Sequence, residues 1–234
     1  MGTGADQAGH GARLIELRVG DEPEAWSRAG FTVSDGVVHA GQVRIRLLGS
    51  GPDGARGIVS WEVAGLEGAE GQLDGLPTSA SYAVVDDAAP APPHPNGTIG
   101  LDHVVVLTPD LDRTIAACEA AGLELRRIRD TTGNGSPMRQ AFFKLGPVVL
   151  EVVSGDVGVG LPAADAPATF WGLAVDVDDL DATAAAMGDG LGRIKTAVQR
   201  GRRIATVRTK DHGISVAIAA MDRRGDRTPS DDGR

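Results

Sequence analysis

The sequence has very few of the residues that several common protein functions require. Only one cysteine, Cys118, occurs among 234 residues, so a disulfide bond within the chain and a cysteine-based zinc site are both excluded. Aromatic residues make up 3% of the chain, which argues against a platform that stacks nucleic-acid bases. The 23 basic residues are outnumbered by 32 acidic ones, and the net charge of −9 argues against a nucleic-acid partner.

Long apolar runs are also missing. No stretch approaches the roughly 20 apolar residues of a membrane span, so no membrane association is predicted. Residues 1–12 lack the basic and apolar pattern of a secretory signal and are expected to form a disordered lead. We therefore predict a cytoplasmic protein, and its apolar fraction of 41% is enough for a folded core.

Proline marks the clearest boundary in the chain. Residues 86–97, DDAAPAPPHPNG, contain four prolines and are expected to form an extended linker. The polar tail at 223–234 is expected to be disordered. These segments separate an N-terminal region at 13–85 from a C-terminal region at 98–222.

The C-terminal region contains an internal repeat. LDHVVVLTPDLD at 101–112 aligns with FWGLAVDVDDLD at 170–181, and each is an apolar strand followed by an acidic turn and an Ala-rich helix. Asp110 and Asp179 are placed to cap these two helices, and Gly190 is placed to end the second one.

Short runs of β-prone residues follow each helix, which gives two strand–helix–strand–strand–strand units at 98–155 and 168–222. The N-terminal region has the same order of elements in a weaker form, including a predicted strand at 31–33, and its second half has no convincing helix. DTTGNGSPM at 130–138 is predicted to be a Gly-rich turn between strands.

The repeated unit, its opening LDHVVVLTPDLDRTIAAC and its close QAFFKLGPVVLEVV resemble the vicinal oxygen chelate superfamily. That group includes glyoxalase I, methylmalonyl-CoA epimerase, extradiol dioxygenases and bleomycin resistance proteins. The resemblance is strong over 98–155, fair over 168–222 and weak over 13–85. It implies an α+β fold in which paired βαβββ units form open, curved mixed sheets around a cleft that holds a divalent metal. It also places 130–138 at the cleft mouth, as a mobile lid.

The resemblance assigns two metal ligands, His103 on the first strand and Glu151 on the last strand of the first unit. Alternation along the strand puts Glu151 on one face with Val149, and an unpaired carboxylate inside VVLEVV would be costly to bury. A histidine and a carboxylate suit Zn²⁺, Mn²⁺, Fe²⁺, Co²⁺ or Ni²⁺. The alternatives are an ordinary core or edge position for His103 and an arginine ion pair for Glu151.

The second unit offers no matching ligands. Gly172 takes the place of the histidine, and Ala217 or Ile218 takes that of the glutamate. A catalytic metal usually needs at least three protein ligands and an open position. The missing ligands could come from a partner subunit in a homodimer or from Glu16 in the N-terminal region, or the site has no metal.

Five further residues are candidates for binding a small-molecule substrate. They are Gln140, Arg139, Phe142, Trp171 and Arg203. Phe142 and Trp171 would line an apolar cleft wall or belong to the core. Arg139 and Arg203 would hold a carboxylate or phosphate. The favoured interpretation of Arg202 and Arg203 is that they solvate a strand edge.

Two classes of function follow. The first is a divalent-metal-dependent lyase or isomerase of the glyoxalase and epimerase type, acting on a small oxygen-chelating substrate through an enediolate, with Glu151 as the catalytic base. The second is a metal-free protein that binds or sequesters a small molecule, as resistance proteins do. The retained pair of His103 and Glu151 favours the first class, and the missing ligands of the second unit favour the second.

Overall fold

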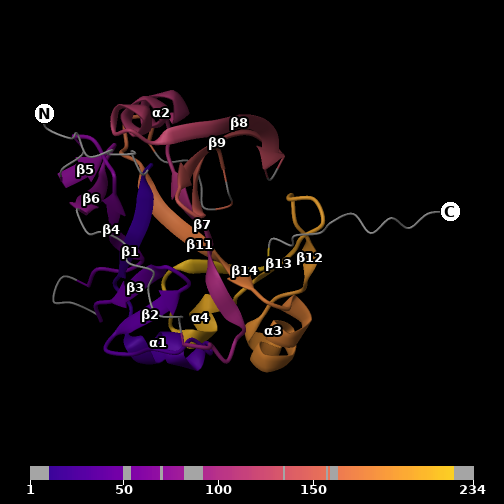
Figure 1. Ribbon diagram of the computed structural model, residues 1–234. Helices are drawn as coiled ribbons and strands as arrows, with labels where there is room; N and C mark the ends of the chain where they lie inside the picture. The colour runs from indigo at the N-terminus through magenta and orange to yellow at the C-terminus, as the bar shows by residue number, and fades with distance from the viewer. Residues whose placement is uncertain are drawn as a thin grey trace, which may run out of the picture.

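The computed structural model describes residues 11–49, 54–68, 71–81, 92–133, 135–156, 158 and 163–223. These residues form two mixed β-sheets with short helices around them (Figure 1). Residues 1–10 of the predicted lead, 86–91 of the predicted linker and 224–234 of the predicted tail lie outside the described residues. The end of the linker is packed: His94 Nε2 lies 2.9 Å from the carbonyl oxygen of His39, and Asn96 Nδ2 donates to the carbonyl oxygen of Ala29 at 3.0 Å.

The N-terminal sheet has six strands in the order β2-β3-β1-β4-β6-β5. Its elements are β1 (Arg13–Val19), α1 (Pro23–Arg28), β2 (Val37–Ala40), β3 (Val43–Leu47), β4 (Ile58–Ala64), β5 (Gly71–Leu73) and β6 (Leu76–Ser81). The predicted strand at 31–33 is wrong, because only Ser34 makes an isolated bridge, to Val37. No helix stands between β4 and β5 within the described residues, as the Gly-rich sequence predicts.

The C-terminal sheet has eight strands in the order β12-β13-β14-β11-β7-β10-β9-β8. The first unit consists of β7 (Thr98–Leu107), α2 (Leu111–Ala120), β8 (Glu124–Gly133), β9 (Ser136–Leu145) and β10 (Val148–Ser154). The second consists of β11 (Thr169–Val177), α3 (Leu180–Met187), the 3₁₀ turn η1 (Gly188–Gly190), β12 (Lys195–Thr196), β13 (Arg203–Thr206), α4 (Thr209–His212) and β14 (Ala217–Asp222). The predicted α+β fold of paired βαβββ units with curved mixed sheets is confirmed.

The two units meet at the centre of the eight-stranded sheet. Their first strands, β7 and β11, run antiparallel, and each lies parallel to the last strand of its own unit, β10 or β14. The predicted turn at 130–138 is wrong over most of its length, since β8 and β9 pair as far as Gly133 and Ser136. The resulting long hairpin curls over one side of the sheet (Figure 1).

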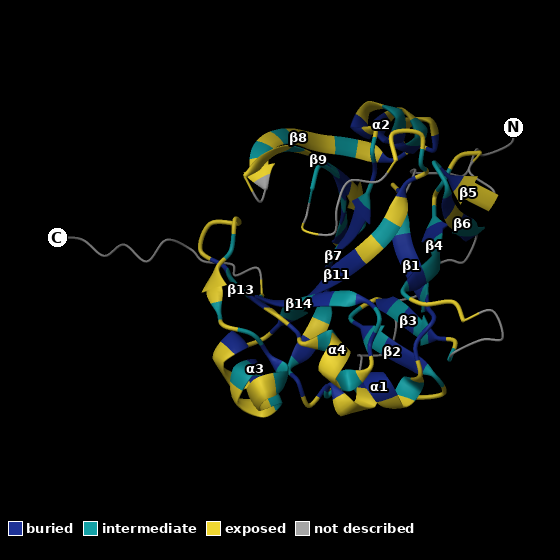
Figure 2. Cartoon of the chain, turned by 180° about the vertical axis from the view of Figure 1, so that it is seen from behind, coloured by how far each residue is buried: buried dark blue, intermediate teal, exposed yellow. Residues whose placement is uncertain are grey.

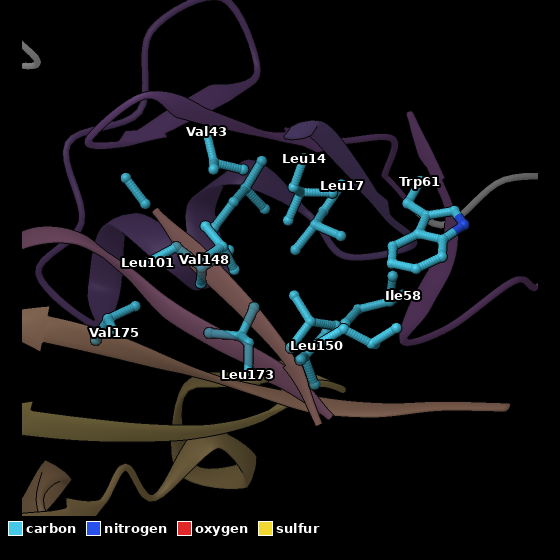
Figure 3. Close-up of a cluster of buried hydrophobic side chains, with 14 of the residues drawn as sticks. Leu14, Leu17, Val43, Ile58, Trp61, Leu101, Val148, Leu150, Leu173 and Val175 are labelled. Atoms are coloured by element: carbon cyan, nitrogen blue, oxygen red, sulfur yellow. The ribbon is translucent and has the colours of Figure 1, made fainter. Parts of the chain in front are cut away.

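One hydrophobic core joins the two sheets. Leu17 and Trp61 of the first sheet face Leu150 and Leu173 of the second, and each of these side chains is at most 3% exposed (Figure 3). Figure 2 shows the same burial along β1, β7 and β14, with exposed residues on α3 and α4. Because successive side chains in a strand point to opposite faces, Glu16 and Glu151 lie on the faces turned away from this core.

Buried polar contacts also hold the two sheets together. Asp21, which follows β1 and is 3% exposed, accepts hydrogen bonds from the backbone N–H of Ser215 at 3.0 Å and from Trp26 Nε1 at 3.1 Å. Asp74, between β5 and β6, accepts from Arg113 Nε of α2 at 2.7 Å. A buried carboxylate is costly unless it is paired, so these contacts fix the relative position of the sheets.

The helix ends follow the predicted chemistry with one exception. Asp110 accepts a hydrogen bond from the N–H of Arg113, and Asp179 accepts from those of Asp181 and Ala182, as expected for N-caps. Gly190 does not end α3, because Gly188 occupies the C-cap with a φ of 52°. Among the helices of the described residues, none has the length and apolar character needed to span a bilayer.

Candidate active site on the eight-stranded sheet

A pocket of about 490 Å³ lies on the side of the eight-stranded sheet that faces away from the shared core. Its walls come from β7, β10 and the β8–β9 hairpin, and Gln199 of the second unit also lines it. His103 and Glu151 both line it, together with Phe142. The sequence-based prediction that these strands bring their polar residues to one place therefore agrees with the structure.

A β-bulge in β7 gives the pocket an additional carboxylate. In the pairing of β7 with β11, His103 lies opposite Ala174 and Leu101 lies opposite Val175, so Asp102 is an extra residue with no opposite partner in the ladder. A bulge re-aims the side chains around it. As a result Asp102 and His103, although adjacent in sequence, both border the pocket.

The orientation of the His103 ring is fixed by a series of contacts between charged side chains. Its Nδ1 lies 2.6 Å from Oδ2 of Asp102, a side chain that is 1% exposed. Oδ1 of Asp102 accepts from Arg202 Nη1 at 2.7 Å, and Arg202 Nη2 donates to Asp176 Oδ1 at 2.5 Å. Because an ionised carboxylate only accepts, Nδ1 is the donor in this contact, and Nε2 is the ring nitrogen turned toward the pocket.

Glu151 faces Nε2 of His103. Its Oε2 lies 3.7 Å from His103 Nε2, and its Oε1 accepts a hydrogen bond from Gln140 Nε2 at 2.5 Å. Burial raises the pKa of Glu151; the charge of His103, the Gln140 hydrogen bond and the charge of Arg129 oppose this without cancelling it. The other amide atom of Gln140, Oε1, is buried and has no hydrogen-bond partner among the described residues.

The second unit has the same backbone arrangement without these side chains. A bulge at Trp171 corresponds to the one at Asp102, and Gly172 follows it as His103 follows Asp102. The expected counterpart of Glu151, Ala217 or Ile218, was wrong by one or two positions. Val149 pairs with His103 as Ala217 pairs with Gly172, so the counterpart is Ala219. No group of three or more His, Cys, Asp or Glu side chains that could hold a metal occurs in the described ranges.

Three of the predicted substrate-binding residues lie away from the pocket. Arg139 is exposed and pairs with Asp112 of α2 at 3.1 Å. Trp171 lines a separate hollow of about 520 Å³ near α4. Arg203 lies in a third hollow, of about 840 Å³, and pairs with Asp222 at 2.7 Å.

Glu16, which was considered as a source of a missing metal ligand, does not line the pocket either. Glu16 is bound by three guanidinium groups, those of Arg18, Arg44 and Arg46, at 3.0–3.2 Å. Burial would raise the pKa of Glu16, but the hydrogen bonds and charges of these arginines outweigh it and lower that pKa. The Glu16 carboxylate therefore forms its ion pairs with arginines of its own sheet.

Sequence reasoning missed Asp102 and misjudged Arg202. Arg202 is 6% exposed and does not solvate a strand edge, as was expected. A signal for Asp102 was present in the sequence: two adjacent polar residues inside an apolar strand break the alternation and indicate a bulge. No comparable signal links Arg202 to Asp102, because the two are 100 positions apart.

Comparison with known proteins agrees with the fold. Residues 102–218, half of the chain, match the model of the glyoxalase/bleomycin resistance protein/dioxygenase superfamily. A search of curated proteins found no match. A variant of 4-hydroxymandelate synthase from Streptomyces coelicolor is 16% identical, covers 92% of both chains and has a TM-score of 0.59. An extradiol ring-cleaving dioxygenase from B. fuscum is 11% identical over 92% of this chain and 74% of its own, with a TM-score of 0.56.

Proposed function

The chain belongs to the glyoxalase/bleomycin resistance protein/dioxygenase superfamily, and we propose that it is a divalent-metal-dependent lyase or isomerase that moves a proton at a carbon beside a carbonyl group of a small molecule. One observation carries the proposal. His103 Nε2 and Glu151 Oε2 meet 3.7 Å apart inside a pocket, and a buried carboxylate holds the other ring nitrogen of His103.

The residues present fit a divalent ion. Two metal–ligand bonds of about 2.1 Å each reach up to about 4.2 Å, so Nε2 and Oε2 can bind one ion together. A metal-binding histidine usually donates its second ring N–H to a carboxylate, and Asp102 supplies that carboxylate. Gln140 Nε2 donates to Glu151 Oε1 and so holds this carboxylate beside His103. His103 and Glu151 would therefore hold the ion, and Zn²⁺, Mn²⁺, Fe²⁺, Co²⁺ and Ni²⁺ suit these two ligands.

In this proposal each side chain of the site has its own role. The bound ion would supply Lewis acidity toward the substrate's oxygen atoms. Glu151 accepts the proton from carbon and returns it, held in place by Gln140. Asp102 keeps the His103 ring in a single tautomer, and Arg202 neutralises Asp102. Phe142 lies opposite Glu151 in the β9–β10 ladder and excludes water from one side of the carboxylate.

The first test is metal content by elemental analysis of the wild type and of a His103→Ala/Glu151→Ala double variant. We expect near-stoichiometric metal in the wild type and its loss in the double variant. An Asp112→Asn variant, which removes an exposed carboxylate of α2, is the control and should keep its metal. Absence of metal from the wild type, even after reloading with each of the five ions, would contradict the proposal.

The second test concerns the reaction. Incubation with carbonyl compounds in D₂O, followed by NMR, should show deuterium entering the carbon next to the carbonyl. Glu151→Gln should abolish this exchange, because an amide cannot accept the proton. The panel would include thiohemiacetals of 2-oxo aldehydes and acyl-CoA epimers.

A metal-free protein that binds a small molecule is the second candidate function. Gly172 and Ala219 favour it, because the second unit supplies neither ligand. A homodimer in which the partner subunit completes the ligand set would reconcile this absence with metal binding. Sedimentation analysis with and without metal distinguishes the two: metal-dependent dimerisation supports the enzyme, and ligand binding by a metal-free monomer supports the binder.

A further inference from the structure

The wall of the pocket formed by the β8–β9 hairpin is cationic. Arg126, Arg127 and Lys144 all line the pocket. In the ladder, Leu125 pairs with Phe143 and Arg127 pairs with Phe142, so Arg126 is an extra residue at a bulge. As at Asp102, the bulge brings two neighbouring polar residues, Arg126 and Arg127, to the same pocket.

These cations are not equivalent. Arg126 pairs with Glu124, and Arg139 further along the hairpin pairs with Asp112 and Asp130. Neither Arg127 nor Lys144 forms an ion pair within the described residues, although Glu124 lies opposite Lys144 in the ladder. The protein has 32 acidic and only 23 basic residues, so two cations without an ion pair on one pocket wall stand out in an acidic chain.

Edge protection is the ordinary explanation for cations on β8, which is the last strand of the sheet. The position of Arg127 argues against it. Its guanidinium carbon lies 4.8 Å from the centre of the Phe142 ring, over a side chain that itself lines the pocket. Stacking of this kind holds a guanidinium plane in place with its N–H groups available. Lys144 is on β9, inside the edge.

We propose that the ligand of this pocket carries an anionic group, a carboxylate or a phosphate, which Arg127 and Lys144 bind. Arg127 would bind it through paired N–H donors and Lys144 as a point charge. The proposal rests on the proposed function only in placing the reacting carbon at Glu151. Anion binding itself needs neither metal nor turnover.

The register sets the size of the ligand. Glu151 lies opposite Phe142, and Phe142 lies opposite Arg127, so two strand spacings of about 4.8 Å separate the carboxylate's strand from that of the arginine. The backbones at Glu151 and Arg127 are then about 10 Å apart, on two walls of a pocket of about 490 Å³. A small organic anion could contact both side chains in a pocket of this size.

The test uses inorganic phosphate and acetate as probes of the two anion chemistries, added to full-length protein that has been treated with chelator. NMR of arginine side-chain N–H and lysine signals would follow each residue, with sodium chloride at equal ionic strength as the reference. We expect the signals of Arg127 and Lys144 to shift with saturation and those of Arg139 to stay in place. The probe that binds more tightly identifies the anion as phosphate or carboxylate.

Matched variants make the result decisive. Arg127→Gln and Lys144→Gln should each weaken binding of the tighter probe at least tenfold, whereas Arg139→Gln should leave it within twofold. The His103→Ala/Glu151→Ala variant should bind the probe at least as tightly as the wild type, because it removes a carboxylate from the pocket and keeps Arg127 and Lys144, so a failure of the proposed chemistry leaves this result intact. Equal shifts at all exposed arginines, or none at Arg127, would overturn the proposal.

Discussion

Each of the two sheets has a glutamate on the face away from the common core, but the surroundings of these glutamates are opposite. Glu16 of β1 is held by Arg18, Arg44 and Arg46, and its pKa is lowered. Glu151 of β10 has an amide and an imidazole as its nearest partners, and its pKa is raised. The difference shows that a polar residue in a strand has a structural role when its charge is neutralised within its own sheet. It is available for chemistry when its charge is not neutralised.

A similar contrast separates the two units of the eight-stranded sheet. Both have a bulge in the first strand, at Asp102 and at Trp171. Only the first unit follows the bulge with a histidine. The second unit nevertheless takes part in the site, because Arg202 reaches across to Asp102. The two units therefore share the backbone geometry of the repeat. The first unit supplies His103 and Glu151, and the second supplies Arg202.

The largest effect is expected from Arg202→Met, which breaks the link between the two units. It removes the guanidinium that neutralises Asp102 and Asp176 in a region where the Arg202 side chain is 7% exposed. Breaking a buried pair typically costs about 3–5 kcal/mol, and we expect that loss in the free energy of unfolding from urea denaturation. Arg203→Met, next to it in sequence but with a side chain that is 41% exposed, is the control and should cost much less. Equal losses in both variants would contradict the assigned role of Arg202.

A second prediction concerns why the second unit lacks a ligand. A Cβ added at Gly172 would stand 2.5 Å from the carbonyl oxygen of Ala217, so β14 would have to move. Gly172→Ala should therefore destabilise the protein by about 1–3 kcal/mol, the usual cost of overpacking. Gly100→Ala in β7 is the matched control, since nothing lies within 4 Å of its added Cβ, and its thermal midpoint should stay close to that of the wild type. If Gly172→Ala is equally neutral, sterics do not explain the missing histidine.

The third prediction concerns Glu16 and how its contribution to stability depends on pH. Because the folded-state pKa of Glu16 is below its ordinary value of 4.5, Glu16 stabilises the protein above that pH and loses this effect as pH falls further. Glu16→Gln should cost about 1–2 kcal/mol at neutral pH, since the three arginines it leaves are partly exposed and can be solvated. The cost should shrink as the pH falls below about 4.5. Urea denaturation between pH 3 and 7 measures both.

Glu151→Gln should have the opposite effect on the free energy of unfolding of the metal-free protein. The raised pKa of Glu151 means that its charged form is disfavoured by folding, so this residue stabilises least at neutral pH. The amide variant should be at least as stable as the wild type at pH 7, and its advantage should disappear toward pH 4. A loss of stability at pH 7 similar to that of Glu16→Gln would show that the two carboxylates have equivalent roles.

Much of this arrangement could be predicted from the sequence, because it depends on local patterns. The repeat gave the paired units, and strand alternation placed Glu151 on a single face, where the structure has it. The register of β14 could not be predicted, since it depends on pairing with β11, and so the counterpart of Glu151 was misplaced from Ala219. Arg202 was misread for the same physical reason: an arginine at a strand end is exposed unless a distant carboxylate, here Asp102, draws it inward.

The smallest effect is expected at Arg126, which pairs with Glu124 on the edge strand. Both side chains are more than half exposed, at 57% and 60%, so solvent screens the attraction and holding the two long side chains together costs entropy. Arg126→Gln should change the free energy of unfolding by less than about 1 kcal/mol, against several for Arg202→Met, in the same urea titration. A loss at Arg126 comparable to that at Arg202 would mean that the β8–β9 hairpin, and not the buried link between the units, holds the pocket in shape.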